Sequence, residues 1–484
     1  MSVLEERGLF WWCDEPIPAG KLAPASSISG LLKIENDGRI SLELDGFLPS
    51  EHGPFAAIAD SGKMLDKSIQ GLLKANGNRL LLTEVIANGG EIRSNNISFQ
   101  RFLAMNCLVG EEVFPADHAP LMFNSLEVGL AGFEGWLRLG SITISRSKEQ
   151  ISAEYKEPTP AVYDVEDGRL AFNFHINGRI PVGKQADHFS IKEAVSIAYS
   201  LNKAVKLEEL RRRYGLLEDL FILLTDSYYR LDWPFVSLDD GTKLRCYFLR
   251  MKSDDLASPP NWHECWTNFP QLRDVFQNIW SNWKRKREEF GPGFYLYLGT
   301  RRGIMLYPEH RFVNLIWGIE AFHRTKYSVE VHSAYKAKLR RILDAVKARA
   351  DNRWLRSKLK YAYEPPLSER IFEAFKGLPI ELEEKRLRTF ADSCAKARND
   401  ISHFGGHREG ASYADFVTDL EKKSSALSIL YHCLLLNEIG VDEKILKWWL
   451  HEGFRSYQNK WYFVQAGLLD KNCLNPKNGG AKSN

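Results

Sequence analysis

Short apolar runs separated by glycine-containing turns dominate the first half of the chain. Residues 28–35 and 39–45 are two such runs, and an Asp-Gly pair lies between them. This arrangement favours a β-hairpin, because glycine supplies the positive φ that a tight turn needs. Further along, Leu170, Phe172 and Phe174 alternate with small or polar residues, which is the two-residue period of a half-buried strand. The recurring turns are Asn36-Asp37-Gly38, Asn76-Gly77-Asn78 and Asp167-Gly168. The pattern predicts a β-rich region arranged as a sandwich or a barrel.

A helix interrupts this region over residues 207–224, where leucines recur near helical spacing. Strand character returns over residues 228–238 and 243–251, and a helical segment then covers about 270–289. That segment ends in Gly291-Pro292-Gly293, which is a strong helix breaker.

From about residue 305 the apolar period changes to 3.6 residues and stays there, which predicts an all-α region. The predicted helices cover residues 311–324, 333–359, 368–376, 382–404, 413–439 and 443–451. We therefore expect a multidomain α+β protein. Its predicted parts are a β-rich region over 1–251, a helical linker over 252–304, a helical bundle over 305–470 and a disordered tail over 471–484.

Composition agrees with two or three globular domains in 484 residues, with 44% hydrophobic and 26% charged residues. The formal net charge is only +3, so any surface for nucleic acid must come from local clustering of cations. The seven cysteines are scattered and His263-Glu264-Cys265 has no paired second half, so we expect reduced thiols and no metal or cofactor. The chain start lacks an apolar signal core, and the longest apolar run, 427–436, is too short to span a bilayer. We expect a cytoplasmic protein with no membrane partner.

Candidate chemistry lies at the end of the helix predicted over residues 382–404. Arg398, Asn399 and His403 occupy its last two turns, and Gly405-Gly406 follow as a C-terminal cap. An apolar seam runs along Leu387, Phe390, Cys394, Ala397, Ile401 and Phe404. At 100° per residue, Asn399 and His403 lie within roughly 40° of each other and point away from the seam, whereas Arg398 lies roughly 140° from His403. The arginine and the histidine can work together only if the long arginine side chain reaches around, if the last turn opens, or if a second subunit supplies a partner.

These residue types suit cleavage of RNA without a metal. Histidine can activate the 2′-hydroxyl near neutral pH, and the planar arginine fork can stabilise charge on the phosphorane. The alternative is that a cation near a helix C-terminus simply interacts favourably with the macrodipole. The adjacent His407 and Arg408 add further protonatable and cationic groups and favour the first interpretation.

The stretch Arg398-Asn399-Asp400-Ile401-Ser402-His403 resembles the Arg-x4–6-His motif of the HEPN superfamily. Gly318-Ile319-Glu320-Ala321-Phe322-His323 resembles the first helix of ApeA-like HEPN domains, and Gly8-Leu9-Phe10-Trp11-Trp12 resembles the start of the N-terminal domain found with them. The resemblance implies a dimeric helical bundle with a composite ribonuclease site. Arg398 and His403 match its catalytic pair, Asn399 matches the accessory polar residue, and Glu320 and Asp400 are supporting candidates.

The resemblance also implies metal-independent cleavage that leaves a 2′,3′-cyclic phosphate and a 5′-hydroxyl. Its biological setting is bacterial anti-phage defence by abortive infection, with a phage-derived trigger. Some HEPN domains only bind RNA or accompany nucleotidyltransferases.

Residues 336–360 contain ten Lys or Arg against two acids, with Trp354 among them. This is either a solvated helix face or a surface that tracks phosphates and stacks a base. The candidate RNA contacts are His407, Arg408, Arg340, Arg341, Lys347, Arg349, Arg353 and Arg356.

Three other positions have two interpretations each. Glu320 either orients Arg398 or pairs with Arg324 one turn later. His323 lies on the apolar side of its helix, so we expect a core histidine with a partner. Phe10-Trp11-Trp12 is either an exposed recognition patch or, as we expect, a buried strand segment.

The leading hypothesis is an endoribonuclease that acts as a defence effector, in which the helical bundle cuts and the β-rich region senses or restrains. The expected substrate is single-stranded or loop RNA, with transfer RNA among the candidates, because unstacked 2′-hydroxyls reach in-line geometry there. A homodimer or higher homo-oligomer is expected. The alternatives are a non-catalytic RNA-binding or protein-interaction scaffold, and a ligand-binding β-sandwich joined to a helical oligomerisation module.

Overall fold

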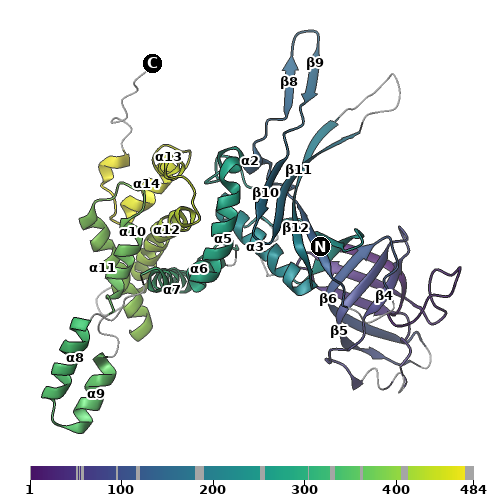
Figure 1. The fold of residues 1–484 in the computed structure, drawn as a ribbon, viewed down its shortest axis with the longest axis horizontal. Coiled ribbons are helices and arrows are strands. Elements are labelled where there is room, and N and C mark those ends of the chain that lie inside the picture. The colour runs from purple at the N-terminus through teal and green to yellow at the C-terminus, as the bar shows by residue number, and fades with distance from the viewer. Residues whose placement is uncertain are drawn as a thin grey trace. The chain divides into compact units, whose positions relative to one another are not determined.

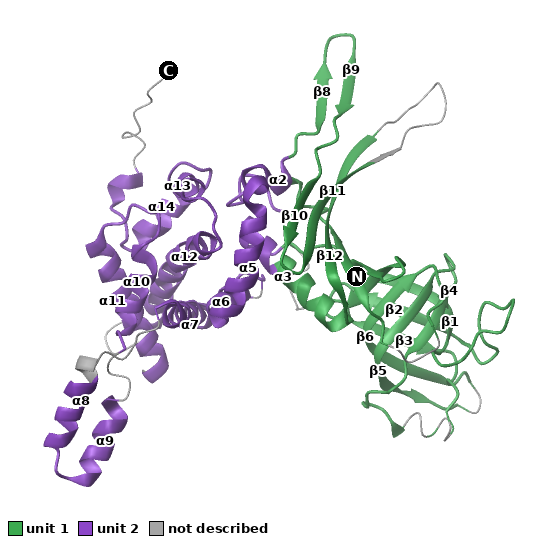
Figure 2. Cartoon of the chain, viewed as in Figure 1, with its two compact units in different colours: residues 1–134, 139–218, 229–258 green, residues 135–138, 219–228, 259–484 purple. Residues whose placement is uncertain are grey.

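The computed structural model describes residues 2–50, 53, 55, 59–93, 96–115, 120–179, 190–250, 257–303, 305–327, 333–359, 364–404 and 412–474. The chain forms two compact units, shown in green and purple in Figure 2. The first comprises residues 1–134, 139–218 and 229–258, and the second comprises residues 135–138, 219–228 and 259–484. The domain boundaries expected at residues 251, 304 and 470 stay predictions.

Six strands of the first unit close into a barrel. They are β1 (Ser2–Trp12), β2 (Ile28–Glu35), β3 (Ile40–Leu44), β4 (Ile69–Leu73), β5 (Arg79–Glu91) and β6 (Phe99–Gly110). Their order is β6-β3-β2-β1-β4-β5, and an additional pairing of β5 with β6 closes the ring. Of the two predicted arrangements, sandwich or barrel, the barrel is confirmed for this part of the chain.

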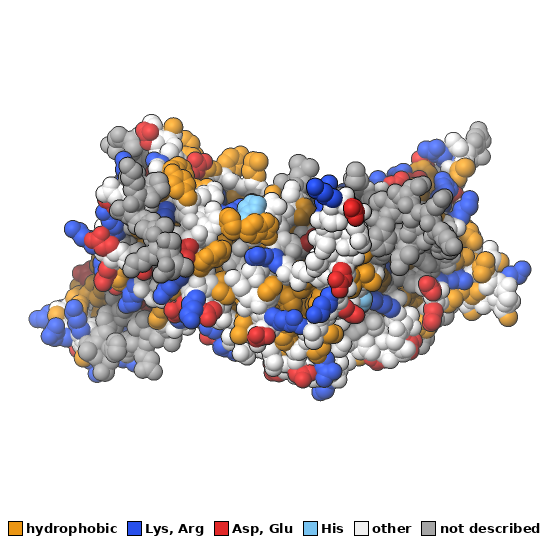
Figure 3. Space-filling view, turned by 90° about the horizontal axis from the view of Figure 1, so that it is seen from above, with side chains coloured by type: hydrophobic (Ala, Val, Ile, Leu, Met, Phe, Trp, Pro, Cys, Tyr) orange, Lys and Arg blue, Asp and Glu red, His pale blue; other side chains and the backbone are white. Residues whose placement is uncertain are grey.

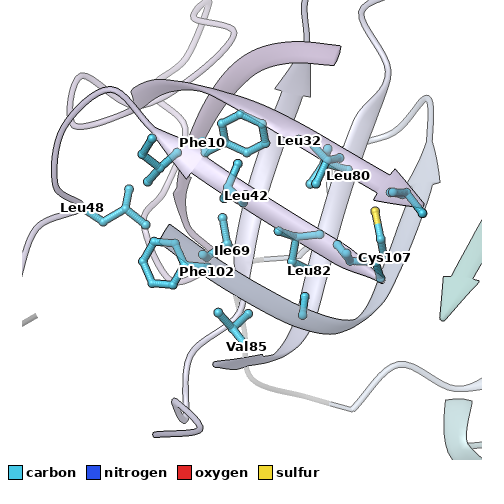
Figure 4. Packing of buried hydrophobic residues seen from close by; sticks show 14 of the residues in the cluster. Phe10, Leu32, Leu42, Leu48, Ile69, Leu80, Leu82, Val85, Phe102 and Cys107 are labelled. Atoms are coloured by element: carbon cyan, nitrogen blue, oxygen red, sulfur yellow. The ribbon is translucent and has the colours of Figure 1, made fainter. Parts of the chain in front are cut away.

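Alternating side chains of these strands fill the barrel (Figure 4). Phe10, Leu32, Leu42, Leu82 and Phe102 are among the buried side chains. Phe10 and Trp11 are fully buried, so the interpretation of this segment as a buried strand is confirmed.

The sheet continues beyond the barrel from β6 in the order β14, β13, β7, β12, β11 and β10. These strands are β7 (Phe123–Gly129), β10 (Ala161–Val165), β11 (Gly168–Arg179), β12 (Ser190–Val205), β13 (Phe235–Leu238) and β14 (Lys243–Phe248). A separate hairpin pairs β8 (Ile142–Arg146) with β9 (Ile151–Tyr155), and α3 (Leu207–Thr225) is the predicted helix. The predicted strand 228–238 is too long, because strand pairing begins only at Phe235.

The remaining helices, apart from the short α2, come after β14 in the chain (Figure 1). They are α2 (Glu134–Leu137), α4 (Phe269–Leu272), α5 (Phe276–Phe290), α6 (Pro292–Thr300), α7 (Pro308–Lys326), α8 (Ser333–Ala345), α9 (Arg349–Leu359), α10 (Leu367–Lys376), α11 (Glu384–Phe404), α12 (Tyr413–Glu438), α13 (Glu443–His451) and α14 (Ser456–Gln465). Two 3-10 turns, η1 (Arg273–Val275) and η2 (Lys471–Leu474), complete the list. No helix in the described ranges combines the length and apolarity needed to cross a bilayer.

Two helix predictions are corrected. Residues 333–359 form two helices rather than one, because the Asn352 side chain donates to the carbonyls of Leu343 and Val346 at the end of α8. The sequence Gly291-Pro292-Gly293 ends α5 but also starts α6, because proline fits the first position of a helix, where its missing N–H is not needed.

Helix α7 lies at the centre of the second unit and packs against α6, α10, α11 and α12. Its apolar face is fully buried through Phe312, Ile316 and Ile319. A Cβ on Gly318 would lie 2.6 Å from the Tyr431 hydroxyl oxygen, so this glycine permits the close approach of α12. Glu320 lies on the flank of this face, about 80° from Phe312 at 100° per residue, and leads to the candidate site.

Candidate active site

Helix α11 packs through the seam that its sequence predicts. Leu387, Phe390, Cys394 and Ala397 are buried, whereas Ile401 is only partly buried. The side chain of Phe404 lies outside the described residues, as do Gly405-Gly406, His407 and Arg408. The glycine cap and the RNA contacts of His407 and Arg408 therefore stay predictions.

The last turns of α11 present the polar residues of the motif away from the seam. His403 is exposed and Asn399 is partly exposed. The side chain of Arg398 is 25% exposed. Asp400 is 7% exposed, so it lies on the buried side of α11, and its supporting role stays a prediction.

Two oxygen acceptors hold the Arg398 guanidinium. Its Nη1 donates to Asn399 Oδ1 at 3.1 Å, and its Nη2 lies 3.6 Å from Glu320 Oε2 on α7. Its Nε is buried and has no acceptor among the described residues. The guanidinium is therefore oriented by an amide of its own helix and by a carboxylate of a neighbouring helix.

Glu320 joins three helices in a cluster of charges. Besides Arg398 of α11, its carboxylate contacts Arg324 of α7 at 3.1 Å and Arg370 of α10 at 3.4 Å. Glu320 thus makes both contacts that its two interpretations require, one with Arg398 and one with Arg324, and its role in orienting Arg398 for chemistry stays a prediction. Glu364 completes the cluster through contacts with Arg324 and Arg370.

Sequence reasoning did not identify Arg370, which is 4% exposed and is the most deeply buried cation of this cluster. A buried arginine needs paired carboxylates, because an unpaired charge in the interior is costly. The available signal was an arginine directly before the apolar Ile371-Phe372 of α10.

Arg398 and His403 do not touch within one chain: no hydrogen bond or ion pair joins them in the portion that the structure describes. A single chain thus presents an oriented guanidinium and, at the same helix end, an exposed imidazole. This arrangement agrees with the angular separation expected from helix geometry.

His323 is a core histidine, as expected from its place on α7. It is almost fully buried, and its Nε2 lies 2.7 Å from Glu373 Oε2 of α10. Burial lowers the pKa of His323 below its ordinary value, although the hydrogen bond with Glu373 acts in the opposite direction.

Two family models match the chain. The model for ApeA N-terminal domain 1 matches residues 5–283, which is more than half of the sequence. The chain belongs to the family of ApeA-like HEPN anti-phage proteins. The second model, Apea-like HEPN, matches residues 313–445 and so includes Glu320 and the whole of α11. Comparisons with curated proteins and with solved structures returned no match.

Besides the motif, the HEPN region of this ApeA-like protein carries a basic helical hairpin, α8–α9. Blue atoms gather at the left of Figure 3, where this hairpin lies in Figure 1. Trp354 of α9 is 61% exposed. The six RNA-contact candidates of this hairpin are all exposed: Arg340, Arg341, Lys347, Arg349, Arg353 and Arg356. None of these six side chains forms an ion pair within the described ranges, and their contact with RNA stays a prediction.

No group of three or more His, Cys, Asp or Glu side chains that could hold a metal occurs in the described ranges. Cys265, the residue of the weak metal pattern, is buried, and its Sγ lies 3.4 Å from the carbonyl oxygen of Asn261. Burial raises the pKa of the Cys265 thiol to about 12, so the metal-binding thiolate is disfavoured.

Proposed function

We propose that this ApeA-like HEPN protein is a metal-independent endoribonuclease whose active edge is Arg398, Asn399 and His403. The observation that carries the proposal is the guanidinium of Arg398, held by Glu320 and Asn399 at the helix end that exposes His403. An oriented cation beside a titratable imidazole is the pair of groups that cleavage through the 2′-hydroxyl requires.

In the proposed reaction, His403 accepts the proton of a ribose 2′-hydroxyl. The 2′-oxygen then forms a bond to the adjacent phosphorus, and the bond from phosphorus to the 5′-oxygen breaks. Arg398 stabilises the negative charge of the phosphorane with its N–H donors. A second imidazole donates a proton to the leaving 5′-oxygen, so the products are a 2′,3′-cyclic phosphate and a 5′-hydroxyl.

The second imidazole is the reason to propose a composite site in a homodimer. A two-fold axis beside the end of α11 brings two copies of His403 and Arg398 together. One histidine then acts as base while the other acts as acid. The proposed substrate is single-stranded or loop RNA, with transfer RNA among the candidates.

The proposed setting is abortive infection in the bacterial cytoplasm. Family membership supports a HEPN-type defence effector. In this proposal a phage-derived trigger acts on the β-rich region and relieves its restraint of the nuclease.

The test is cleavage of a single-stranded RNA by the full chain in EDTA. We expect His403→Ala to abolish cleavage and to leave thermal stability unchanged, because the side chain is exposed. The matched control is His310→Ala, which removes another exposed histidine of the same unit and should leave cleavage intact. Cleavage by His403→Ala at the normal rate would contradict the proposal.

A second candidate function is non-catalytic RNA binding, and the exposed cations of α8–α9 favour it. It predicts that Arg398 and His403 can be replaced without loss of function, whereas replacement of the α8–α9 arginines abolishes it.

A further inference from the structure

A polar cavity lies within the helical unit, shown in purple in Figure 2, and none of its lining residues belongs to the Arg398 cluster. Its volume is about 200 Å³. It is lined by residues of α6, α7, α12, α13 and α14 together with Asp226 and Trp266. Helix α7 contributes to both places, since Arg311 lines the cavity and Glu320 belongs to the candidate active site.

Three arginines line this cavity, and a single carboxylate, that of Asp226, lies among them. Arg301 donates to Asp226. Arg455 approaches Asp226 at 3.8 Å and contacts Glu264, which lies outside the lining, at 2.8 Å. Two carboxylates, Asp226 and Glu264, therefore lie near three guanidinium groups.

Arg311 is the cation in excess. Its Nη2 donates to the Ser428 hydroxyl at 3.3 Å, and in the described ranges no carboxylate pairs with it. Burial lowers the pKa of Arg311, and the nearby Arg301 lowers it further. A guanidinium stays charged in proteins, so the cavity keeps an uncompensated positive charge.

Two further N–H donors of the lining are deeply buried and have no acceptor among the residues that the structure describes. Trp266 Nε1 belongs to a side chain that is 2% exposed, and Asn459 Nδ2 belongs to one that is 3% exposed. Trp266 cannot turn freely, because its ring stacks on Trp449 and on His432. A buried donor without an acceptor costs stability, so water or a bound ligand commonly supplies the missing acceptor.

His432 does not add to the positive charge. Burial lowers its pKa to about 4, even though Asp226 lies 3.4 Å away and favours the protonated form. Its Nδ1 shares a 2.7 Å hydrogen bond with the Tyr297 hydroxyl. The cavity is therefore rich in donors and poor in acceptors, with the positive charge confined to arginines.

We propose that this cavity binds a small anion that carries a phosphate group. The guanidinium groups of Arg301, Arg311 and Arg455 line the cavity together with Trp266 and Asn459. Each guanidinium carries five N–H donors, so even after the contacts with Asp226 and Glu264 the lining offers more donors than the about four lone pairs of a carboxylate can accept. A phosphate offers more oxygens, and its negative charge would lie among three arginines. The site is independent of the proposed ribonuclease activity, because none of its residues belongs to the Arg398 edge.

Calorimetric titration of the full chain tests this proposal. The probes are inorganic phosphate, adenosine 5′-monophosphate and, as the carboxylate comparison, acetate. We expect a phosphate compound to bind with one site per chain and acetate to bind much more weakly. Inorganic phosphate and the nucleotide separate the free anion from a phosphorylated small molecule.

Arg311→Gln should raise the Kd for the phosphate compound by about tenfold or more, because it removes a charged donor. Arg455→Gln, at a more exposed position, tests the site if Arg311→Gln fails to fold. The matched control is Arg285→Gln, an exposed arginine of the same unit that lies outside the cavity and should leave Kd unchanged. The proposal is overturned if neither phosphate compound binds at millimolar concentration, or if both cavity variants bind as the parent chain does.

Discussion

At the residue scale, Glu320 connects the polar end of α11 to the rest of the bundle. Its carboxylate meets the guanidinium groups of Arg324, Arg370 and Arg398 from three different helices. Arg370 depends most on the Glu320 carboxylate, because the Arg370 guanidinium is buried and water cannot solvate its charge.

Glu320→Gln removes this charge while keeping the shape of the side chain. We expect it to lower the free energy of unfolding by about 1–3 kcal/mol, since the buried Arg370 loses one of its two carboxylates. Arg324→Gln is the control. Arg324 is exposed, so its loss should cost less than about 1 kcal/mol. Urea unfolding measures both values, and equal losses would contradict the central place of Glu320.

His432 predicts a pH dependence of stability. Its pKa is about 4 in the folded chain, below the ordinary value of 6.5. The unfolded chain therefore takes up the proton first, so this contribution to stability is complete above the ordinary value and is lost as pH falls toward 4. The loss is on the order of 3 kcal/mol.

The measurement is urea unfolding of the parent chain and of His432→Gln at several pH values. The variant should show a flatter decline in stability through this acidic window. If the stability of the two chains falls in parallel as the pH is lowered, His432 does not titrate with the lowered pKa that its burial implies.

At the element scale, the exposed cations of α8–α9 lead to a separate prediction about RNA affinity. Replacing four exposed arginines of this hairpin by glutamine should weaken RNA binding. It should also reduce the slope of log K against log salt by up to about 3, because each phosphate contact on single strands contributes about 0.7. The substituted residues are Arg340, Arg341, Arg353 and Arg356.

The control is a variant of the same unit that loses four exposed cations elsewhere. These are Arg285, Lys422, Lys444 and Lys447. Filter binding at several salt concentrations compares the two variants. If both lose the same affinity and slope, general charge rather than the hairpin binds RNA.

The 3.6-residue period of apolar positions predicted most helices, because this period can be read from each helix's own sequence without its neighbours. Residues 443–451 and 28–35 are reproduced as α13 and β2. Periodicity did not predict helix ends that depend on a single side chain. Asn352 of α9 is an example, because its side chain bonds to the backbone at the end of α8. Helix α14 was not predicted.

The candidate site was predictable in part for the same reason. Arg398, Asn399 and His403 share one helix end, so helix geometry alone describes their directions. Arg370 lies 28 positions before Arg398 in the chain, and only tertiary packing brings it to Glu320. The burial of Asp400 likewise follows from the neighbours of α11, which no local pattern reveals.

At the scale of the whole molecule, closure of the barrel depends on pairing between distant strands. Strand β1 pairs with both β2 and β4, while β3 pairs with β6. Hairpin turns predict only neighbouring pairs, so sequence alone left sandwich and barrel open. The family match over residues 5–283 shows that this β-rich region belongs with the HEPN helices in one type of protein.

The proposed composite site predicts that an inactive chain lowers the activity of its partner. In an equal mixture of the parent chain with His403→Ala, random pairing leaves both imidazoles in only a quarter of the dimers. After re-equilibration we therefore expect about a quarter of the activity that the same number of parent chains shows. An equal mixture of the parent chain with His310→Ala is the control and should keep full activity. Half of the parent activity in the first mixture, although mixed dimers form, would show that each chain cuts alone.

We propose that RNA is cut by its own 2′-hydroxyl at the Arg398–His403 edge without a metal. The chemical nature of the new RNA ends tests this after incubation of the full chain with single-stranded RNA in EDTA. We expect a 2′,3′-cyclic phosphate and a 5′-hydroxyl, and no new ends with His403→Ala. Ends with a 3′-hydroxyl and a 5′-phosphate, or cleavage that EDTA abolishes, would contradict the proposed mechanism.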